Sequence, residues 1–173
     1  NQDPKTDKRE IDEFIEHIKL VQTKRFVLIS TVGVYKNADS VNEDSEIITE
    51  GLSPYGAHRY YLETVCSKLF KTTVVRLPGL FGKGLKKNVI YDILHNNQIE
   101  KIHKDGVYQY YDLNNIWKDI RWAIENDIVL INFATEPVRT EELVKECFGM
   151  DFKNAPDGIS PAFWDMRSKY AKL

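Results

Sequence analysis

The sequence has few of the residues that build disulfide scaffolds, metal centres and membrane spans. Its 173 residues include only two cysteines, Cys66 and Cys147, and no Cys-x-x-Cys pair. A disulfide framework or a structural zinc site is therefore not expected, and the reducing cytoplasm is the expected compartment. The longest apolar runs, such as 26–29 and 128–131, are much shorter than the roughly 20 residues of a membrane helix, so no membrane contact is expected.

The chain also has no excess of positive charge. It contains 24 Lys and Arg against 26 Asp and Glu, which gives a formal net charge of -2. Nucleic acids are bound mainly through their phosphates by basic surfaces, so a nucleic-acid partner is not expected. The composition, 42% hydrophobic and 29% charged, is that of an ordinary globular protein.

Alternating apolar patterns predict a parallel α/β fold. Apolar residues recur every three or four positions over 7–22 and 54–70, which indicates two amphipathic helices. Each helix is followed by a short apolar run, at 26–30 and 72–77, of the kind that forms a strand buried on both faces. Helices and strands in this order predict part of a doubly wound parallel sheet, a Rossmann-like α/β fold.

The other segments have weaker patterns. Residues 36–53 are polar and acidic, and 78–84 are rich in glycine, so we expect both to be loops. The patterns further predict strands at 107–112 and 128–133, and helices at 89–94, 114–126, 139–148 and near the end of 151–173.

The sequence also predicts whether three particular side chains are buried or exposed. Cys66 and Cys147 lie on apolar helical faces, which predicts that both belong to the core. The polar neighbours of His58 predict a surface position for its ring.

Two polar segments lie where ligands bind in open α/β sheets, at the ends of strands and the starts of helices. Ser30 and Thr31 end the first strand, and Tyr55 precedes Arg59 by four residues at the start of the second long helix. This spacing puts Tyr55 and Arg59 on the same helical face. A nearby positive charge favours the phenolate form of a tyrosine, which predicts an acid–base pair beside an orienting hydroxyl. The same residues also fit simpler roles, with Tyr55 packing in the first helical turn and Thr31 bonding the backbone.

Four short motifs follow one another along the chain: Ser-Thr-Val-Gly-Val-Tyr at 30–35, Pro-Tyr-Gly at 54–56, Arg-Leu-Pro-Gly-Leu-Phe-Gly at 76–82 and Tyr-Tyr-Asp-Leu-Asn-Asn at 110–115. With this order and spacing the chain resembles the extended short-chain dehydrogenase/reductase family, the NAD-dependent epimerase/dehydratases that act mostly on nucleotide sugars. The resemblance extends over roughly residues 8–150 and implies an oxidoreductase or epimerase that uses NAD or NADP.

The resemblance also implies roles for particular residues. It implies that Tyr55 is the catalytic acid–base, that Thr31 is the hydroxyl beside it and that Arg59 is the cation. The residues implied at the cofactor are Ser30, Tyr55, Arg59, Leu77, Pro78, Gly79 and Leu80. The residues expected at a small-molecule substrate, such as a nucleotide sugar, are Val32, Gly33, Lys83, Lys86, Lys87 and Asn88. The three lysines also fit a solvated charged turn, and no metal site is expected.

The chain departs from the family pattern at particular positions. The family motif is Tyr-x-x-x-Lys, whereas the last position here is Arg59, which keeps the charge but presents it with another geometry. Gly79 stands where an asparagine is common, and Tyr108 where an arginine that binds the substrate diphosphate is common.

The chain also lacks the Gly-x-x-Gly-x-x-Gly turn that binds the cofactor pyrophosphate in this family, and it begins at Asn1 without a methionine. We therefore expect the later part of a longer enzyme, without its first strands. Residues 1–78 would form the second half of a Rossmann-like domain, and 79–173 a mixed substrate-binding portion. Such a fragment should bind NAD(H) or NADP(H) weakly or not at all.

Two consequences concern partners. The resemblance implies a homodimer in which helices 8–22 and 54–70 pair with their copies. The alternative to an enzyme is a noncatalytic interaction or dimerisation module derived from the same fold.

Overall fold

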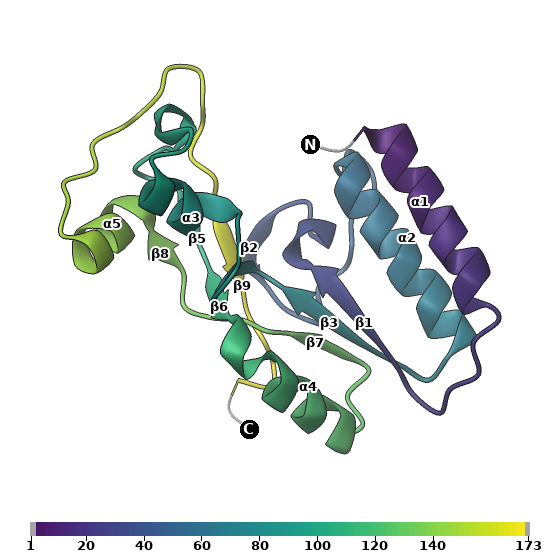
Figure 1. Ribbon diagram of the computed structural model, residues 1–173. Helices are drawn as coiled ribbons and strands as arrows, with labels where there is room; N and C mark the ends of the chain where they lie inside the picture. Colours follow the sequence, from purple (N-terminus) through teal and green to yellow (C-terminus); the bar gives the residue numbers. More distant parts are fainter. Residues whose placement is uncertain (1–2, 172–173) are drawn as a thin grey trace.

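The computed structural model describes residues 3–171 and has two adjoining parts, a helix-covered sheet and a smaller lobe of short elements (Figure 1). The sheet is parallel, with strands in the order β1 (Phe26–Thr31), β3 (Thr72–Leu77) and β7 (Leu130–Asn132). Helices α1 (Pro4–Ile18) and α2 (Pro54–Leu69) lie side by side on one face, and α4 (Ile116–Glu125) covers the other. The predicted α/β fold with parallel strands is confirmed.

The central strand shows why this sequence makes two layers of core. All of β3 is buried, and alternate side chains of a strand point to opposite faces. Val74 packs with the apolar stripes of α1 and α2, whereas Val75 packs with α4. A continuous apolar run is therefore needed, because both faces of this strand lie under helices.

Capping residues determine where the two long helices begin. The Asp3 carboxylate accepts a hydrogen bond from the Thr6 amide at 2.9 Å, and the Ser53 hydroxyl accepts one from the Gly56 amide at 3.1 Å. Each cap is followed by a proline, a favoured residue in the first turn. Helix α1 ends at Ile18 and not near residue 22, because the chain turns away from the core and leaves Leu20 83% exposed.

The remaining elements are short. They are η1 (Val32–Val34), β2 (Ala38–Val41), β4 (Gly79–Phe81), α3 (Asn88–His95), η2 (Ile99–Lys101), β5 (Val107–Tyr108), β6 (Tyr110–Asp112), η3 (Leu113–Asn115), β8 (Val138–Arg139), α5 (Thr140–Phe148) and β9 (Trp164–Met166). Strand β2 pairs with β9, β4 with β6, and β5 with β8. The smaller lobe has its own apolar cluster, formed by Ile93, Ile102, Val144 and Phe152.

Two predictions about the polar segments were wrong. The segment 36–53 is not entirely a loop, because β2 lies within it, and the end of the chain contains β9 where a helix was expected. The two strands pair in parallel, and the Arg167 amide donates to the Val41 carbonyl at 2.6 Å. Neither strand has a partner nearby in the sequence, so their local patterns could not indicate the pairing.

The expected strand at 107–112 is divided in two by an inward side chain. Gln109 is 1% exposed, and its side-chain amide exchanges hydrogen bonds with the backbone of Met166 at 2.7 and 2.8 Å. Strands β5 and β6 on either side of it therefore have different partners. The expected loop at 78–84 also contains a strand, β4, which pairs with β6.

The two cysteines differ in burial, so the expectation that both are core residues was wrong for one of them. Cys66 on α2 is fully buried, and Cys147 on α5 is exposed. Burial raises the pKa of the Cys66 thiol to about 11. Because the thiolate is the reactive form, we expect a thiol reagent at pH 8 to modify Cys147 rapidly and Cys66 only after urea is added. Equal rates for Cys66→Ala and Cys147→Ala variants in the native state would contradict this.

Candidate active site

A cavity of about 550 Å³ lies beyond the C-terminal end of β1. Thr31, Val32 and Gly33 line it from the strand end and η1, and Tyr55 lines it from the start of α2. The Tyr55 side chain is half exposed, and its hydroxyl has no hydrogen-bond partner among residues 3–171. The Thr31 hydroxyl accepts a hydrogen bond from the Gly33 amide at 3.1 Å, so it stabilises the turn at the rim of the cavity.

A close approach of two backbones places Tyr55 at this cavity. A Cβ atom on Gly56 would lie 2.1 Å from the carbonyl oxygen of Gly33, so only glycine allows the start of α2 to pack against η1. The Tyr55 ring consequently lies beside Gly33, with its Cε1 atom 3.4 Å from the position that a Gly33 Cβ would take. The predicted strand-end and helix-start motifs thus line a common cavity.

Arg59 contacts Tyr55 on one side and a residue of α1 on the other. Its guanidinium carbon lies 4.7 Å from the centroid of the Tyr55 ring, in agreement with their four-residue spacing. An Arg59 Nη2 donates to Asp7 Oδ1 at 2.9 Å, and the other carboxylate oxygen of Asp7 lies 2.7 Å from Nδ1 of His58. The prediction that His58 is a surface residue was wrong, because only 18% of its side chain is exposed.

Asp7 belongs to none of the predicted motifs, although its position in the sequence carries a signal. Asp7 is 5% exposed and lies on the buried stripe that Ile11, Ile15 and Ile18 form along α1. An acidic residue in register with an apolar stripe indicates a buried charge that needs a partner, because burying an unpaired charge is costly. Which residue of α2 it meets depends on how the two helices pack.

The partners of Asp7 make its contribution to stability depend on pH. Burial raises the pKa of the Asp7 carboxyl, but the hydrogen bond from His58 and the charge of Arg59 outweigh burial and lower the pKa below its ordinary value. A lowered folded-state pKa gives stability that is present above the unfolded-state pKa of about 3.9 and is lost as the pH falls through the folded-state value.

We therefore expect Asp7→Asn to lower the urea midpoint at pH 7 and to differ less and less from the parent as the pH falls below about 4. The matched control is Asp12→Asn, which changes an exposed carboxylate of the same helix. A gap between Asp7→Asn and parent that stays constant down to pH 3 would contradict the expectation.

Ser30, implied at the cofactor, belongs to a buried polar network. Its hydroxyl is buried and donates to the carboxylate of Glu63 on α2. Glu63 also pairs with Arg76 of β3, with Nη2 to Oε2 at 2.6 Å and Nε to Oε1 at 3.1 Å. A third Arg76 donor, Nη1, reaches the Tyr35 hydroxyl at 2.8 Å, which connects the network to the segment after η1. The motifs at 76–82 and 30–35 contain Arg76 and Tyr35 but do not indicate that their side chains meet.

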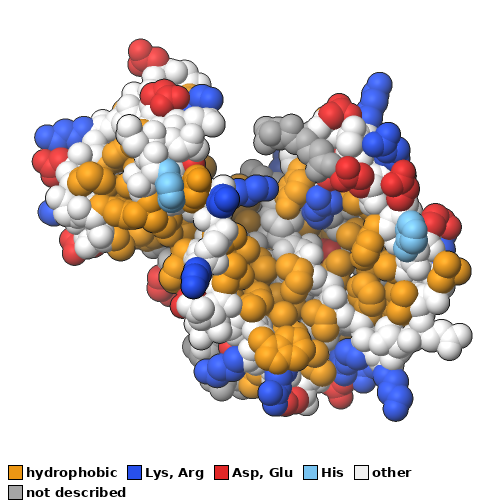
Figure 2. All heavy atoms as spheres, in the orientation of Figure 1, with side chains coloured by type: hydrophobic (Ala, Val, Ile, Leu, Met, Phe, Trp, Pro, Cys, Tyr) orange, Lys and Arg blue, Asp and Glu red, His pale blue; other side chains and the backbone are white. Residues whose placement is uncertain are grey.

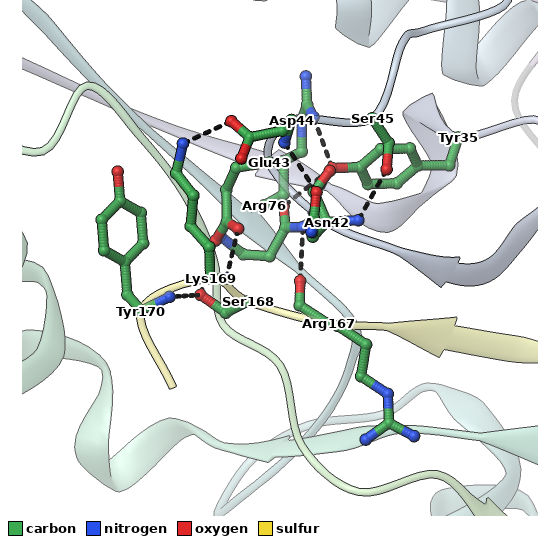
Figure 3. A network of polar contacts seen from close by, with 11 residues as sticks. Tyr35, Asn42, Glu43, Asp44, Ser45, Arg76, Arg167, Ser168, Lys169 and Tyr170 are labelled. Carbon is green, nitrogen blue, oxygen red and sulfur yellow. Dashed lines mark hydrogen bonds and ion pairs between the residues drawn. The ribbon is translucent and has the colours of Figure 1, made fainter. Parts of the chain in front are cut away.

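A second carboxylate continues this network to the C-terminal segment (Figure 3). Glu43 is buried and accepts hydrogen bonds from the Asn132 amide at 2.8 Å, the Ser168 hydroxyl at 2.6 Å and the Lys169 amide at 2.9 Å. These contacts fasten the segment between β1 and α2 to β7 and to residues 168–169. The chain between Thr31 and Tyr55 is thereby held by groups far away in the sequence.

The C-terminal ends of β1 and β3 lie side by side. The motifs at 30–35 and 76–82 are therefore neighbours in the sheet. Leu77 pairs with Thr31 in the sheet register, and both Leu77 and Pro78 are buried. Gly79 follows in β4, where a Cβ atom would lie 2.7 Å from the Gln109 carbonyl oxygen. The asparagine that is common at this position in the family would therefore require β4 and β6 to move apart.

The other implied substrate residues lie in a different place. Lys83, Lys86 and Lys87 are exposed and form no hydrogen bond or ion pair within the described part of the chain. Asn88 donates to the Leu80 carbonyl, and its side-chain oxygen accepts from the Ile90 amide at 3.0 Å, so it fastens the start of α3 to β4.

A second cavity of about 230 Å³ lies between β4 and α3. Leu80, Lys87 and Asn88 line it, whereas Lys83 and Lys86 line neither this cavity nor the one at Tyr55. Lys and Arg side chains are visible where the smaller lobe meets the sheet, beside a notch in the surface (Figure 2). The structure thus places Thr31, Gly33 and Tyr55 at one cavity and Lys87 at another.

Within residues 3–171, no helix combines the length and apolar character that crossing a membrane requires. The same residues contain no group of three or more His, Cys, Asp and Glu side chains arranged to hold a metal ion.

An open parallel sheet with helices on both faces is a Rossmann-like α/β architecture. Residues 12–119, more than half of the chain, match the model of the NAD dependent epimerase/dehydratase family. The chain belongs to this family. A comparison with curated proteins found no match.

Solved structures share the fold. UDP-galactose 4-epimerase has a TM-score of 0.71 at 19% identity, with 97% of this chain and 63% of that chain covered. UDP-glucuronic acid 4-epimerase from Bacillus cereus in complex with NAD has a TM-score of 0.69 at 18% identity, covering 94% and 57%. TunA, an NAD-dependent NDP-hexosamine 5,6-dehydratase, has a TM-score of 0.69 at 15% identity, covering 93% and 59%. The chain therefore spans about three fifths of these proteins.

Proposed function

We propose that the chain is the later part of an NAD-dependent epimerase, dehydratase or reductase that acts on a nucleotide sugar or a related carbonyl compound. The observation that carries this proposal is the cavity shared by Thr31 and Tyr55, with the Arg59 guanidinium against the Tyr55 ring. The similar structures named as UDP-sugar epimerases support the choice of substrate class. The free thiols of Cys66 and Cys147 agree with a reducing, cytoplasmic location.

The residues present fit one part of the cofactor site. The Tyr55 hydroxyl is unpartnered within residues 3–171, and Arg59 has guanidinium donors beyond the one that Asp7 binds. When bound, NAD accepts a hydride from the substrate or returns one to it. Tyr55 takes or gives the proton at the reacting oxygen, and Thr31 orients that oxygen. Ser30 already donates to Glu63, so its side chain supports α2 and leaves cofactor contact to its neighbours.

The exposed edge of the sheet supports a longer protein. Strand β1 is the first strand in the order β1-β3-β7, and Ile29 on it is 48% exposed. Apolar side chains are visible over the middle of the molecule in Figure 2. In the proposed enzyme, further strands that carry the glycine turn cover this edge and hold the cofactor pyrophosphate.

Two experiments test the proposal. The longer protein is expressed from a gene that includes the coding sequence upstream of this chain. It is incubated with NAD and with UDP-glucose, UDP-galactose or UDP-glucuronic acid, and sugar products are followed by NMR. Formation of an epimer or a dehydrated sugar is expected. Calorimetry with the 173-residue chain alone should show weak or no binding of NAD(H), and micromolar binding would contradict the proposed division of the cofactor site.

We also propose that the chain forms a homodimer through α1 and α2. Phe14 on α1 and Tyr61 and Leu69 on α2 are each more than 40% exposed, although they lie on the two longest helices. Light scattering at tens of micromolar should detect dimers, since an association of roughly 8 kcal/mol is well populated at that concentration. A monomer at that concentration would count against the dimer and also against the noncatalytic dimerisation module.

A further inference from the structure

The strongest unassigned feature is the buried carboxylate of Asp7 behind the candidate active site. Asp7 lies in the first turn of α1, yet both of its carboxylate oxygens are directed to α2, one to His58 and one to Arg59. Acidic residues commonly stabilise the first turn of a helix through its dipole, but that role requires neither burial nor a partner on another helix. The 5% exposure of Asp7 and its two partners require another explanation.

The geometry of Arg59 indicates what the Asp7 carboxylate does. A guanidinium is planar and carries five donors. Asp7 binds one Nη2 donor at 2.9 Å, and the guanidinium carbon lies over the Tyr55 ring at 4.7 Å from its centroid. No other hydrogen bond of Arg59 is found among residues 3–171, and its side chain remains 25% exposed. Asp7 thus binds one donor of Arg59 beside the Tyr55 ring, and the remaining guanidinium donors are left for a ligand.

We propose that Asp7 is the positioning residue for the acid–base pair. Its carboxylate holds the Arg59 guanidinium over the Tyr55 ring, which a long flexible arginine side chain would not maintain by itself. Asp7 therefore adapts the site to an arginine at this position. This inference rests on the proposed function for its catalytic meaning, but the placement of Arg59 can be measured without any substrate.

The first test uses NMR on the 173-residue chain. The Arg59 side-chain Nε–H signal is assigned by its absence in Arg59→Lys. Its ring-current shift is the difference between its chemical shift in the parent and its chemical shift in Tyr55→Leu. We expect Asp7→Ala to abolish this ring-current shift and the isosteric Asp7→Asn to reduce it by about half, because the charge attraction is lost. Asp12→Asn, which alters an exposed carboxylate of α1, should leave the shift unchanged.

An unchanged ring-current shift in either folded variant would overturn the proposal. If Asp7→Ala does not fold, as judged by circular dichroism, Asp7→Asn decides by itself.

A second test separates positioning from the proposed function. In the longer enzyme, Asp7→Asn is expected to lower kcat at least tenfold in the parent and to have little further effect when Tyr55 is already phenylalanine. Equal losses in both backgrounds would show that Asp7 acts through stability alone and would overturn the inference. A fully active Tyr55→Phe enzyme would instead contradict the proposed function, while the NMR result would still report where Asp7 holds Arg59.

Discussion

Replacing Tyr55 with phenylalanine is expected to lower turnover of the longer enzyme by about 100- to 10,000-fold, the usual contribution of a positioned acid–base. The change removes one hydroxyl that has no partner within the described residues, and it keeps the ring against which Arg59 packs. The loss should therefore appear in the rate at which the sugar product forms and not in the urea midpoint. Tyr61→Phe is the matched control, because Tyr61 is a similarly exposed tyrosine on the same helix.

Substitutions of Arg59 extend this experiment. Arg59→Met is expected to reduce turnover strongly, because it removes both the charge and the donors beside Tyr55, whereas Arg59→Lys keeps the charge and should be tolerated. Full activity in Arg59→Met would show that the charge is irrelevant and would contradict the catalytic interpretation of the motif. An inert parent together with an active Arg59→Lys enzyme would favour the noncatalytic module.

Replacing Arg76 with methionine is expected to destabilise the folded chain by about 3–5 kcal/mol, the usual cost of removing one partner of a buried ion pair. The Arg76 and Glu63 side chains are only 4% and 6% exposed, so the substitution leaves a buried carboxylate without its counter-charge. Burial disfavours the charged form of Arg76, but the hydrogen bonds and charge of Glu63 outweigh burial and raise the pKa of Arg76. Urea unfolding at pH 7 measures the loss.

Two controls show whether the unpaired charge is the cause. The double variant Glu63→Leu, Arg76→Met removes both charges and should be considerably more stable than Arg76→Met alone. Arg121→Met breaks an ion pair with Glu125 whose side chains are more than 60% exposed, and such pairs contribute roughly 0–1 kcal/mol. A double variant as unstable as the single one would show that packing around Arg76, and not its charge, accounts for the loss.

Local patterns in the sequence were sufficient to predict the features that depend on neighbouring residues. The alternation of helices with buried runs predicted the parallel sheet, since a strand covered on both faces must be apolar throughout. The apolar pattern over 54–70 predicted where α2 begins, and the four-residue spacing of Tyr55 and Arg59 predicted that their side chains meet. These inferences hold because capping and helical periodicity act over only a few residues.

Contacts between residues that are distant in the chain depend on how the elements pack. The local pattern does not indicate strand β2, which is defined by its pairing with β9. Gln109 interrupts a strand because the Met166 backbone lies beside it. Asp7 pairs with Arg59, more than 50 positions away, because the packing of α1 against α2 brings the two side chains together. Local patterns show that a polar group faces the core and needs a partner, but the partner is selected by packing between elements, which no short window of sequence contains.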